Sequence, residues 1–225
     1  MRESTPNLAE LPKEPKFIPK SELEDLSQEI GQEKGYYRIR SGNRVYHLTI
    51  DCDVYDEDTM GIPFLLIPRL PALPEGIEPV WHPQCVDVLS LRKPKRYRSG
   101  VHEVLFNSGP AFANIACWAH EIPRLGNETY VYQLLAEQDT RDEISPIAPG
   151  FLAHLTENGC VMGFLMEEVE GRFASIDDLA ACERALGRFH GDVNRYNFLV
   201  DRASGEVRLL DFKQTRIFDP EKAAQ

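Results

Sequence analysis

The sequence predicts an α+β fold in which antiparallel hairpins are separated by two helices. The first observation behind this prediction is a series of short apolar runs bounded by Gly, Asn and Ser turn signals. The second is a pair of longer stretches, 127–138 and 175–189, with apolar residues at helical spacing. The third is the composition, because 42% hydrophobic residues in a chain of 225 provide the core of one or two domains.

Residues 1–95 predict two segments of different character. Residues 1–35 are rich in proline and charge, so we expect a flexible N-terminal segment. Leu23, Leu26 and Ile30 have the spacing of a short amphipathic helix, but a solvated tail is the interpretation that the composition favours. Residues 36–95 predict a β-hairpin that turns at Gly42, followed by a proline-rich extension.

Residues 96–225 predict a third segment with a regular pattern of strands and helices. Asn127 is the expected N-cap of the first helix, and Ser175 that of a second helix that runs through Phe189. Gly-containing turns near 107–110 and 157–159 predict two hairpins. The expected strands are 102–106, 112–118, 151–155, 161–166, 198–200 and 207–210.

Charge and cysteine content exclude several classes of function. The net charge of −11 argues against nucleic-acid binding, although nucleotide phosphates can still be bound locally. The basic cluster at 93–98 predicts only a solvated face. Five cysteines without a C-x-x-C pair predict free thiols, and no apolar run is long enough to span a membrane. We therefore expect a soluble cytoplasmic protein with no nucleic-acid or membrane partner.

One motif carries chemistry: His190-Gly191-Asp192, then Asn197, a short strand, a turn, a second strand and Asp211-Phe212. Phosphoryl transfer needs a carboxylate that orients or deprotonates the acceptor hydroxyl, and Asp192 is placed for that role. It also needs oxygen ligands that hold Mg²⁺ on the triphosphate, which suits the amide of Asn197 and the carboxylate of Asp211. Each residue alone is typical of a loop, but the three together at this spacing indicate descent from a kinase.

This arrangement resembles the protein-kinase-like superfamily, in the His-Gly-Asp form of aminoglycoside phosphotransferases, and is similar to a group of fungal kinase-like proteins. The resemblance covers about residues 81–211 and implies an antiparallel-sheet N-lobe with a truncated helical C-lobe. It implies ATP and Mg²⁺ as cofactors and an unknown small-molecule or protein acceptor. Its motifs are Trp81-His82-Pro83, Val101-His102-Glu103-Val104, Glu121-Ile122-Pro123, Glu128-Thr129, Gly163-Phe164-Leu165-Met166-Glu167 and Asn194-Arg195-Tyr196-Asn197-Phe198-Leu199.

The resemblance assigns further site residues. The backbone carbonyl of Glu167 and the amide of Val169 are implied to bind adenine, with Met166 at the gatekeeper position. Glu128 matches the glutamate that pairs with the strand lysine of kinases. Asn114 stands at that lysine position, so the cation for the α- and β-phosphates is missing and Glu128 loses its partner.

Several departures from the family pattern concern function. No lysine lies between Lys95 and Lys213, so no near neighbour in sequence replaces the strand lysine. The strand that precedes His-Gly-Asp in relatives is missing, and Lys213 replaces the usual Gly, which we interpret as a mild change. The glycine-rich loop is also missing, and Ser108-Gly109-Pro110 is the candidate phosphate-facing turn.

Three hypotheses follow from this pattern. The first is an ATP-dependent phosphotransferase, impaired by the loss of the strand lysine. The second is a pseudokinase, a nucleotide-binding module without transfer activity. The third is a truncated kinase-like gene product, suggested by the short catalytic-loop approach and by the end of the chain at Gln225.

Overall fold

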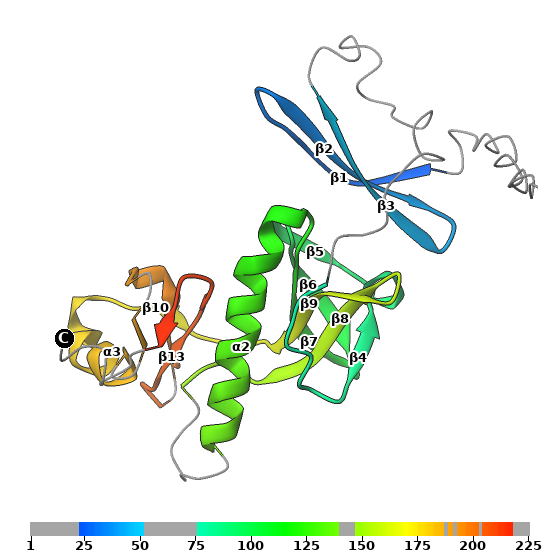
Figure 1. Ribbon diagram of the computed structural model, residues 1–225. Coiled ribbons are helices and arrows are strands. Elements are labelled where there is room, and N and C mark those ends of the chain that lie inside the picture. Colours follow the sequence, from blue (N-terminus) through cyan, green and yellow to red (C-terminus); the bar gives the residue numbers. More distant parts are fainter. Residues whose placement is uncertain are drawn as a thin grey trace, which may run out of the picture. The chain divides into compact units, whose positions relative to one another are not determined.

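The computed structural model describes residues 23–51, 76–139, 147–186, 189–190, 193–202 and 204–217 (Figure 1). The chain forms two compact units, Met1–Ala72 and Leu73–Gln225. In the described part of the chain, neither helix combines the length and apolar character needed to cross a bilayer.

The first unit is a three-stranded antiparallel meander of β1 (Leu23–Ile30), β2 (Lys34–Ser41) and β3 (Arg44–Asp51). The hairpin between β2 and β3 is confirmed, with Gly42 at φ +60° in its turn. Strand β1 replaces both the solvated tail and the short helix considered for residues 23–30, while residues 1–22 of the expected flexible segment lie outside the described residues. Its residues pair along the edge of β2, and Glu24 lies 3.4 Å from Arg40 on the neighbouring strand. Cross-strand pairing of this kind cannot be recognised from the spacing of three apolar residues.

The second unit is built on a six-stranded sheet with the order β4-β8-β9-β7-β6-β5. All its pairs are antiparallel except β4 with β8. The pairing of β4 with β8 places residues 85–87 in this unit, whereas we expected them in the proline-rich extension. The strands are β4 (Cys85–Asp87), β5 (Lys95–Arg98), β6 (Val101–Phe106), β7 (Gly109–Ile115), β8 (Phe151–Glu157) and β9 (Cys160–Glu167).

Helix α2 (Ile122–Asp139) follows β7 and packs against the sheet (Figure 1). It begins five residues before the predicted start, so Asn127 is not its cap. The chain enters it through the 3-10 turn η4 (Ala119–Glu121), where the Glu121 carboxylate accepts the amides of Cys117 and Trp118 at 2.8 and 3.1 Å. The helix contributes Leu125, Val131, Tyr132 and Leu135 to a core that also contains Met162, Phe164 and Phe212.

The remaining chain forms short elements beyond β9. Helix α3 ends at Leu186, and Phe189–His190 forms strand β11, paired with β14 (Arg216–Ile217). This corrects the expected extent of the helix, which does not run through Phe189. The two-residue strand β11 includes His190, the first residue of the His-Gly-Asp motif. The hairpin of β12 and β13 is confirmed, with Phe198 opposite Leu209. The other elements are η3 (Val88–Ser90), β10 (Arg172–Phe173), η5 (Ile176–Asp178), α3 (Leu179–Leu186), η6 (Arg195–Asn197), β12 (Phe198–Val200) and β13 (Val207–Leu209).

His154 anchors the segment before β4 to the sheet. It is fully buried on β8, and its Nε2 accepts the backbone amides of Trp81 and His82, each at 3.2 Å. Burial, and then the neighbouring His82, lower the pKa of His154 from 6.5 to about 4. The imidazole is therefore neutral at physiological pH and acts as a structural acceptor.

Replacing His154 by leucine should lower the free energy of unfolding by on the order of 2–5 kcal/mol, because two buried amides lose their acceptor. The contribution of His154 to the stability of the parent should fall as the pH falls from 6.5 toward 4, since the unfolded chain binds the proton first. His154→Leu should lack that part of the pH dependence. Urea unfolding at pH 7.5 and 4.5 measures both effects, with tryptophan fluorescence as the signal because both tryptophans, Trp81 and Trp118, belong to the second unit.

The matched control is His120→Gln, at an exposed position. A loss of stability in His154→Leu no larger than in this control would contradict the anchoring role.

Candidate functional site

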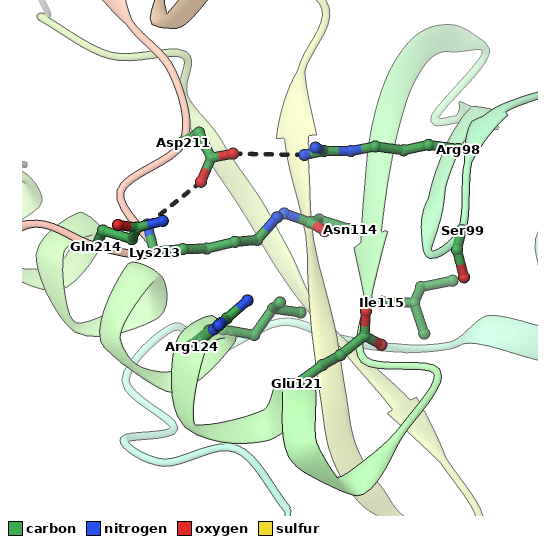
Figure 2. Close-up of a pocket in the computed structure, with 10 residues that line it drawn as sticks. Arg98, Ser99, Asn114, Ile115, Glu121, Arg124, Asp211, Lys213 and Gln214 are labelled. Atoms are coloured by element: carbon green, nitrogen blue, oxygen red, sulfur yellow. Dashed lines mark hydrogen bonds and ion pairs between the residues drawn. The ribbon is translucent and has the colours of Figure 1, made fainter. Parts of the chain in front are cut away.

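A cavity of about 360 Å³ lies where the β5–β6 turn, β7, the start of α2 and the chain after β13 meet (Figure 2). Its wall carries three cationic side chains, from Arg98, Arg124 and Lys213, and two carboxylates, from Glu121 and Asp211. The sign of the local charge is thus opposite to the net charge of the chain, as an anion site requires. The lining residues are Arg98, Ser99, Asn114, Ile115, Glu121, Arg124, Leu125, Asp211, Lys213 and Gln214.

Asn114 points from β7 toward α2. It lies opposite Val101 on β6 and Phe164 on β9, and it is 5% exposed. Its Nδ2 donates to Oε2 of Glu128 at 3.1 Å. Strands β7 and β9 can approach this closely because residue 163 is a glycine. A Cβ at this position would collide with the carbonyl oxygen of Asn114. The sheet and α2 are therefore joined by a buried amide–carboxylate contact at the position where we expected the pairing of Glu128 to be lost.

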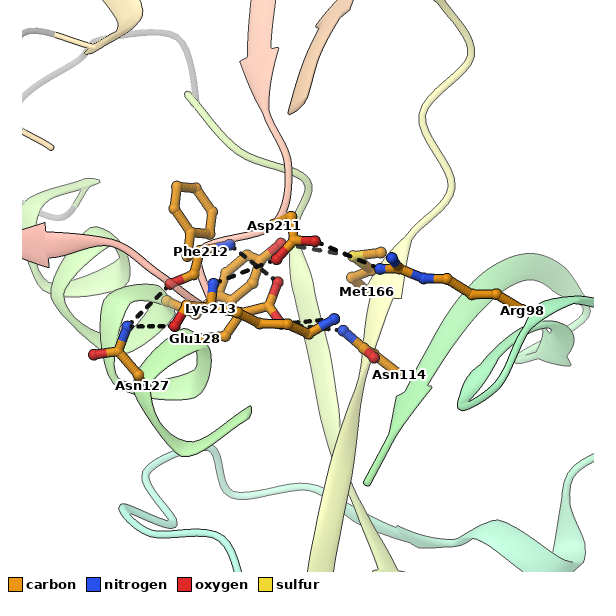
Figure 3. Close-up of polar contacts among 9 residues, drawn as sticks. Arg98, Asn114, Asn127, Glu128, Met166, Asp211, Phe212 and Lys213 are labelled. Atoms are coloured by element: carbon orange, nitrogen blue, oxygen red, sulfur yellow. Dashed lines mark hydrogen bonds and ion pairs between the residues drawn. The ribbon is translucent and has the colours of Figure 1, made fainter. Parts of the chain in front are cut away.

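Glu128 has a cationic partner, which corrects the expectation that it loses one. It is 2% exposed, and its Oε2 lies 3.9 Å from Nζ of Lys213 (Figure 3). Its Oε1 accepts the backbone amide of Phe212 at 3.2 Å. The absence of lysines between Lys95 and Lys213 misled the prediction, because the chain after Asp211 folds back onto α2 and brings Lys213 to the carboxylate.

Asn127 holds the same segment from the adjacent position on α2. Its Nδ2 donates to the carbonyl oxygens of Phe212, Lys213 and Thr215 at 3.0, 3.3 and 3.1 Å. Phe212 is 2% exposed and packs edge-on against Tyr132, with ring centroids 5.4 Å apart. Asn127 therefore acts as a clamp for residues 212–215.

Burial raises the pKa of Glu128 from 4.5 to about 7. Lys213 opposes this rise most strongly, Asp211 adds to it, and the Phe212 amide and Arg98 oppose it. The carboxylate form of Glu128 therefore depends on the Lys213 ammonium. Burial, followed by Glu128 and Asp211, also raises the pKa of Tyr132.

Asp211 lies at the edge of the cavity with φ +61°, in the left-handed region that Asp and Asn tolerate better than other side chains. Its Oδ2 lies 3.5 Å from a guanidinium nitrogen of Arg98, and its Oδ1 accepts the amide of Lys213 at 3.4 Å. The side chain is 31% exposed and that of Arg98 is 60% exposed, so this ion pair is open to solvent.

Asn197, the last residue of η6, is brought next to this segment as the hairpin prediction required. Its carbonyl oxygen accepts the amide of Leu210, the residue before Asp211, at 2.7 Å. An amide oxygen and a carboxylate are ligands that suit Mg²⁺, which keeps several waters and substrate phosphates in its coordination sphere. The described residues hold no cluster of three or more His, Cys, Asp or Glu that suits a metal. The assignment of Asn197 and Asp211 to Mg²⁺ stays a prediction.

The expected adenine-binding segment follows β9. Glu167 ends the strand, donates its amide to the Gly150 carbonyl at 2.8 Å, and accepts the Gly150 amide through its carboxylate at 3.2 Å. Met166 accepts the Tyr132 hydroxyl through its sulfur at 3.6 Å, and Val169 is half-buried. Adenine binding by the backbone of Glu167 and Val169 remains a prediction. Asp192 lies outside the described residues, so its role also stays a prediction.

The cavity is bordered by a different turn from the one we expected. Val101 pairs with Asn114 at one end of the β6–β7 hairpin, while Ser108 and Gly109 form the turn at the other end. The turn at the cavity is Ser99-Gly100, with Gly100 at φ +73° and no room for a Cβ beside the Ile115 carbonyl. Residues 94–98 are exposed, as expected of a solvated face, and Arg98 also lines the cavity. Arg98, Arg124 and Lys213 are the cations of the cavity, and sequence analysis assigned none of them to the site.

No family model and no curated protein matches the sequence. Among solved structures, the 2.2 Å crystal structure of WbdD is 23% identical over 63% of this chain and 34% of the WbdD chain, with a TM-score of 0.35. The co-crystal structure of WbdD with the kinase inhibitor LY294002 is 24% identical over 62% and 33%, with a TM-score of 0.31. The chain thus spans about a third of the length of these structures. Similarity of this extent assigns neither a family nor a function.

The buried carboxylate generates a pH-dependent prediction. Because the pKa of Glu128 is about 7 in the folded protein and 4.5 ordinarily, the folded state binds more protons between these values. The contribution of Glu128 to stability should therefore fall as the pH rises through this interval. Relative to the parent, Glu128→Gln should gain on the order of 3 kcal/mol between pH 4.5 and 8.

Urea unfolding by tryptophan fluorescence measures this difference, and the contribution of His154 cancels because both proteins contain it. Glu183→Gln, at an exposed position on α3, controls for the loss of one negative charge. A difference between Glu128→Gln and the parent that does not change with pH would show that Glu128 is charged at all these pH values.

Proposed function

We propose that the second unit is a kinase-like phosphotransferase, which binds Mg²⁺–ATP and transfers the γ-phosphate to a hydroxyl of an acceptor. The observation that carries the proposal is the buried Glu128. It binds β7 through Asn114 and the Asp211–Lys213 segment through the Phe212 amide and the Lys213 ammonium. In protein kinases a lysine–glutamate ion pair and a metal-binding Asp must both be in place for transfer, and Glu128 here joins a strand, a lysine and the segment of Asp211.

The charges of the cavity support phosphate as the bound group. Phosphoryl transfer depends on positioning and on electrostatic stabilisation rather than on covalent chemistry with the protein. Arg98, Arg124 and Lys213 supply cations to one cavity wall of an otherwise acidic chain. A triphosphate that enters the cavity finds these cations next to Asp211.

The individual roles are those that the resemblance to kinases implies. The backbone of Glu167 and Val169 would hold adenine beside Met166, and Asn197 and Asp211 would hold Mg²⁺. The metal would neutralise charge on the phosphates. In the transfer step, the acceptor oxygen bonds to the γ-phosphorus, the bond to the β–γ bridging oxygen breaks, and ADP leaves. Asp192 takes the proton of the acceptor hydroxyl.

A nucleotide-binding module without transfer activity is the second candidate. The observation that favours it is Asn114, a neutral residue at the position that resembles the kinase lysine. Such a module binds Mg²⁺–ATP but forms no ADP, so binding and turnover measured on the same sample separate the two candidates. A chain that binds no ATP would contradict both.

The metal role of Asp211 predicts that Asp211→Asn loses most of the Mg²⁺-dependent part of its ATP affinity. Asparagine suits the left-handed backbone at this position, so the change removes charge with little strain. Calorimetric titration with ATP in Mg²⁺ and in EDTA measures the metal-dependent part. Asp201→Asn, in the turn of the β12–β13 hairpin, is the control. Equal Mg²⁺ dependence in the parent and in Asp211→Asn would show that the assignment is wrong.

The role of Asp192 predicts a different pattern of loss. Asp192→Ala should reduce phosphate transfer by roughly 10²- to 10⁴-fold, the usual contribution of a general base, while ATP affinity stays unchanged. Turnover is measured as ADP release, with water or a mixture of small alcohols as the acceptor. Calorimetry measures the affinity for ATP. Turnover that survives intact in Asp192→Ala would contradict the proposed base.

A further inference from the structure

We propose that Lys213 is the cation that binds the nucleotide phosphates, in place of a lysine at the position of Asn114. The inference rests on the proposed function of the cavity as an ATP site. In kinases, the lysine of the strand before the first helix contacts the α- and β-phosphates and pairs with a glutamate of that helix. Here β7 supplies Asn114, and the segment after Asp211 supplies the lysine.

The two side chains converge on one oxygen. Nδ2 of Asn114 lies 3.1 Å and Nζ of Lys213 lies 3.9 Å from the same Oε2 of Glu128. Both residues also line the cavity (Figure 2). The Lys213 ammonium therefore lies beside Glu128, the carboxylate that a lysine on β7 would reach. Its side chain extends toward Glu128 from the opposite side of the site.

The geometry leaves the ammonium able to bind a second anion. At 3.9 Å, the contact with Glu128 is an ion pair at long range rather than a short hydrogen bond. An ammonium has three N–H donors, and one carboxylate at this distance does not occupy them all. A phosphate oxygen at the cavity side of Nζ would therefore add a charge-assisted hydrogen bond.

Burial distinguishes Lys213 from the other two cations of the cavity. Its side chain is 18% exposed, whereas that of Arg98 is 60% exposed and Arg124 is also exposed. Water and salt screen exposed charges more strongly than buried ones. Lys213 is thus the cavity cation whose charge acts on a bound phosphate with least screening.

The backbone of Lys213 is held on both sides. Its amide donates to Oδ1 of Asp211 at 3.4 Å, and its carbonyl accepts Nδ2 of Asn127 at 3.3 Å. The Phe212 amide, one residue before, binds Glu128. These contacts fix the backbone position of Lys213, which reduces the entropy lost when its ammonium is positioned.

A neutral residue at position 114 fits this arrangement. A second ammonium at this point would compete with Lys213 for one buried carboxylate, and like charges that are close and desolvated repel strongly. We therefore expect Asn114→Lys alone to bring no gain in ATP affinity. The same change should restore affinity when Lys213 has been removed.

Calorimetric titration of the full chain with Mg²⁺–ATP and with adenosine tests the role. Lys213→Met should weaken ATP binding roughly 10- to 100-fold, the contribution of one charge-assisted hydrogen bond. Adenosine binding should stay unchanged, because adenosine carries no phosphate. The double variant Asn114→Lys with Lys213→Met should recover most of the ATP affinity. The control is Lys34→Met, whose ammonium also lies 3.9 Å from a carboxylate, that of Asp51, but at an exposed site of the first unit.

The outcomes separate the two proposals. Equal ATP affinity in Lys213→Met and the parent overturns the role of Lys213 and leaves the ATP site intact. Parallel loss of ATP and adenosine binding, without recovery in the double variant, shows a structural role and also overturns it. A parent that binds no ATP overturns the proposed function, and the role of Lys213 with it. If Lys213→Met is unfolded at the assay temperature, Lys213→Gln is measured instead, because its amide can still donate to Glu128.

Discussion

The burial of one carboxylate constrains the arrangement of the second unit. Removing an ionised side chain from water costs several kcal/mol unless donors and a counter-charge replace the lost hydration. Glu128 is 2% exposed, and three groups from two elements replace its hydration: Asn114 of β7, and the Phe212 amide and the Lys213 ammonium of the segment after β13. The strand, the helix and the segment after β13 must all be in position before this carboxylate is satisfied. The cavity is the space that these three elements enclose.

Two neighbouring residues of α2 act on that segment in complementary ways. Glu128 binds its donors, the Phe212 amide and the Lys213 ammonium, while Asn127 binds its acceptors, the carbonyls of residues 212, 213 and 215. Phe212 adds an aromatic contact with Tyr132 on the same helix. The position of Asp211 is therefore set mainly by α2, although the residue belongs to the β13 end of the chain.

Local patterns predicted the elements whose partners lie nearby in sequence. The hairpins β6–β7, β8–β9 and β12–β13 were predicted because their turns and alternating strands are contiguous. Phe189 continued the helical spacing of α3, and its true partner, Ile217, is not recognisable from that spacing. Lys213 was missed for the same reason. The Phe212 amide of its segment donates to Glu128, which lies 84 residues earlier in the sequence. Local sequence patterns do not report such a long-range contact.

The position of the lysine has a consequence for how the proposed site assembles. A lysine on β7 would belong to the sheet, and its charge would be present whether or not the segment after β13 were docked. Lys213 and Asp211 lie two residues apart on that segment, so the proposed phosphate-binding cation and the proposed metal-binding carboxylate arrive or leave together. A ligand that contacts both must then bind the docked segment more tightly than the undocked one, and it stabilises docking by the same free energy. In the proposed site, nucleotide binding and the packing of Phe212 against α2 are thereby linked through Glu128, which contacts both the Phe212 amide and the Lys213 ammonium.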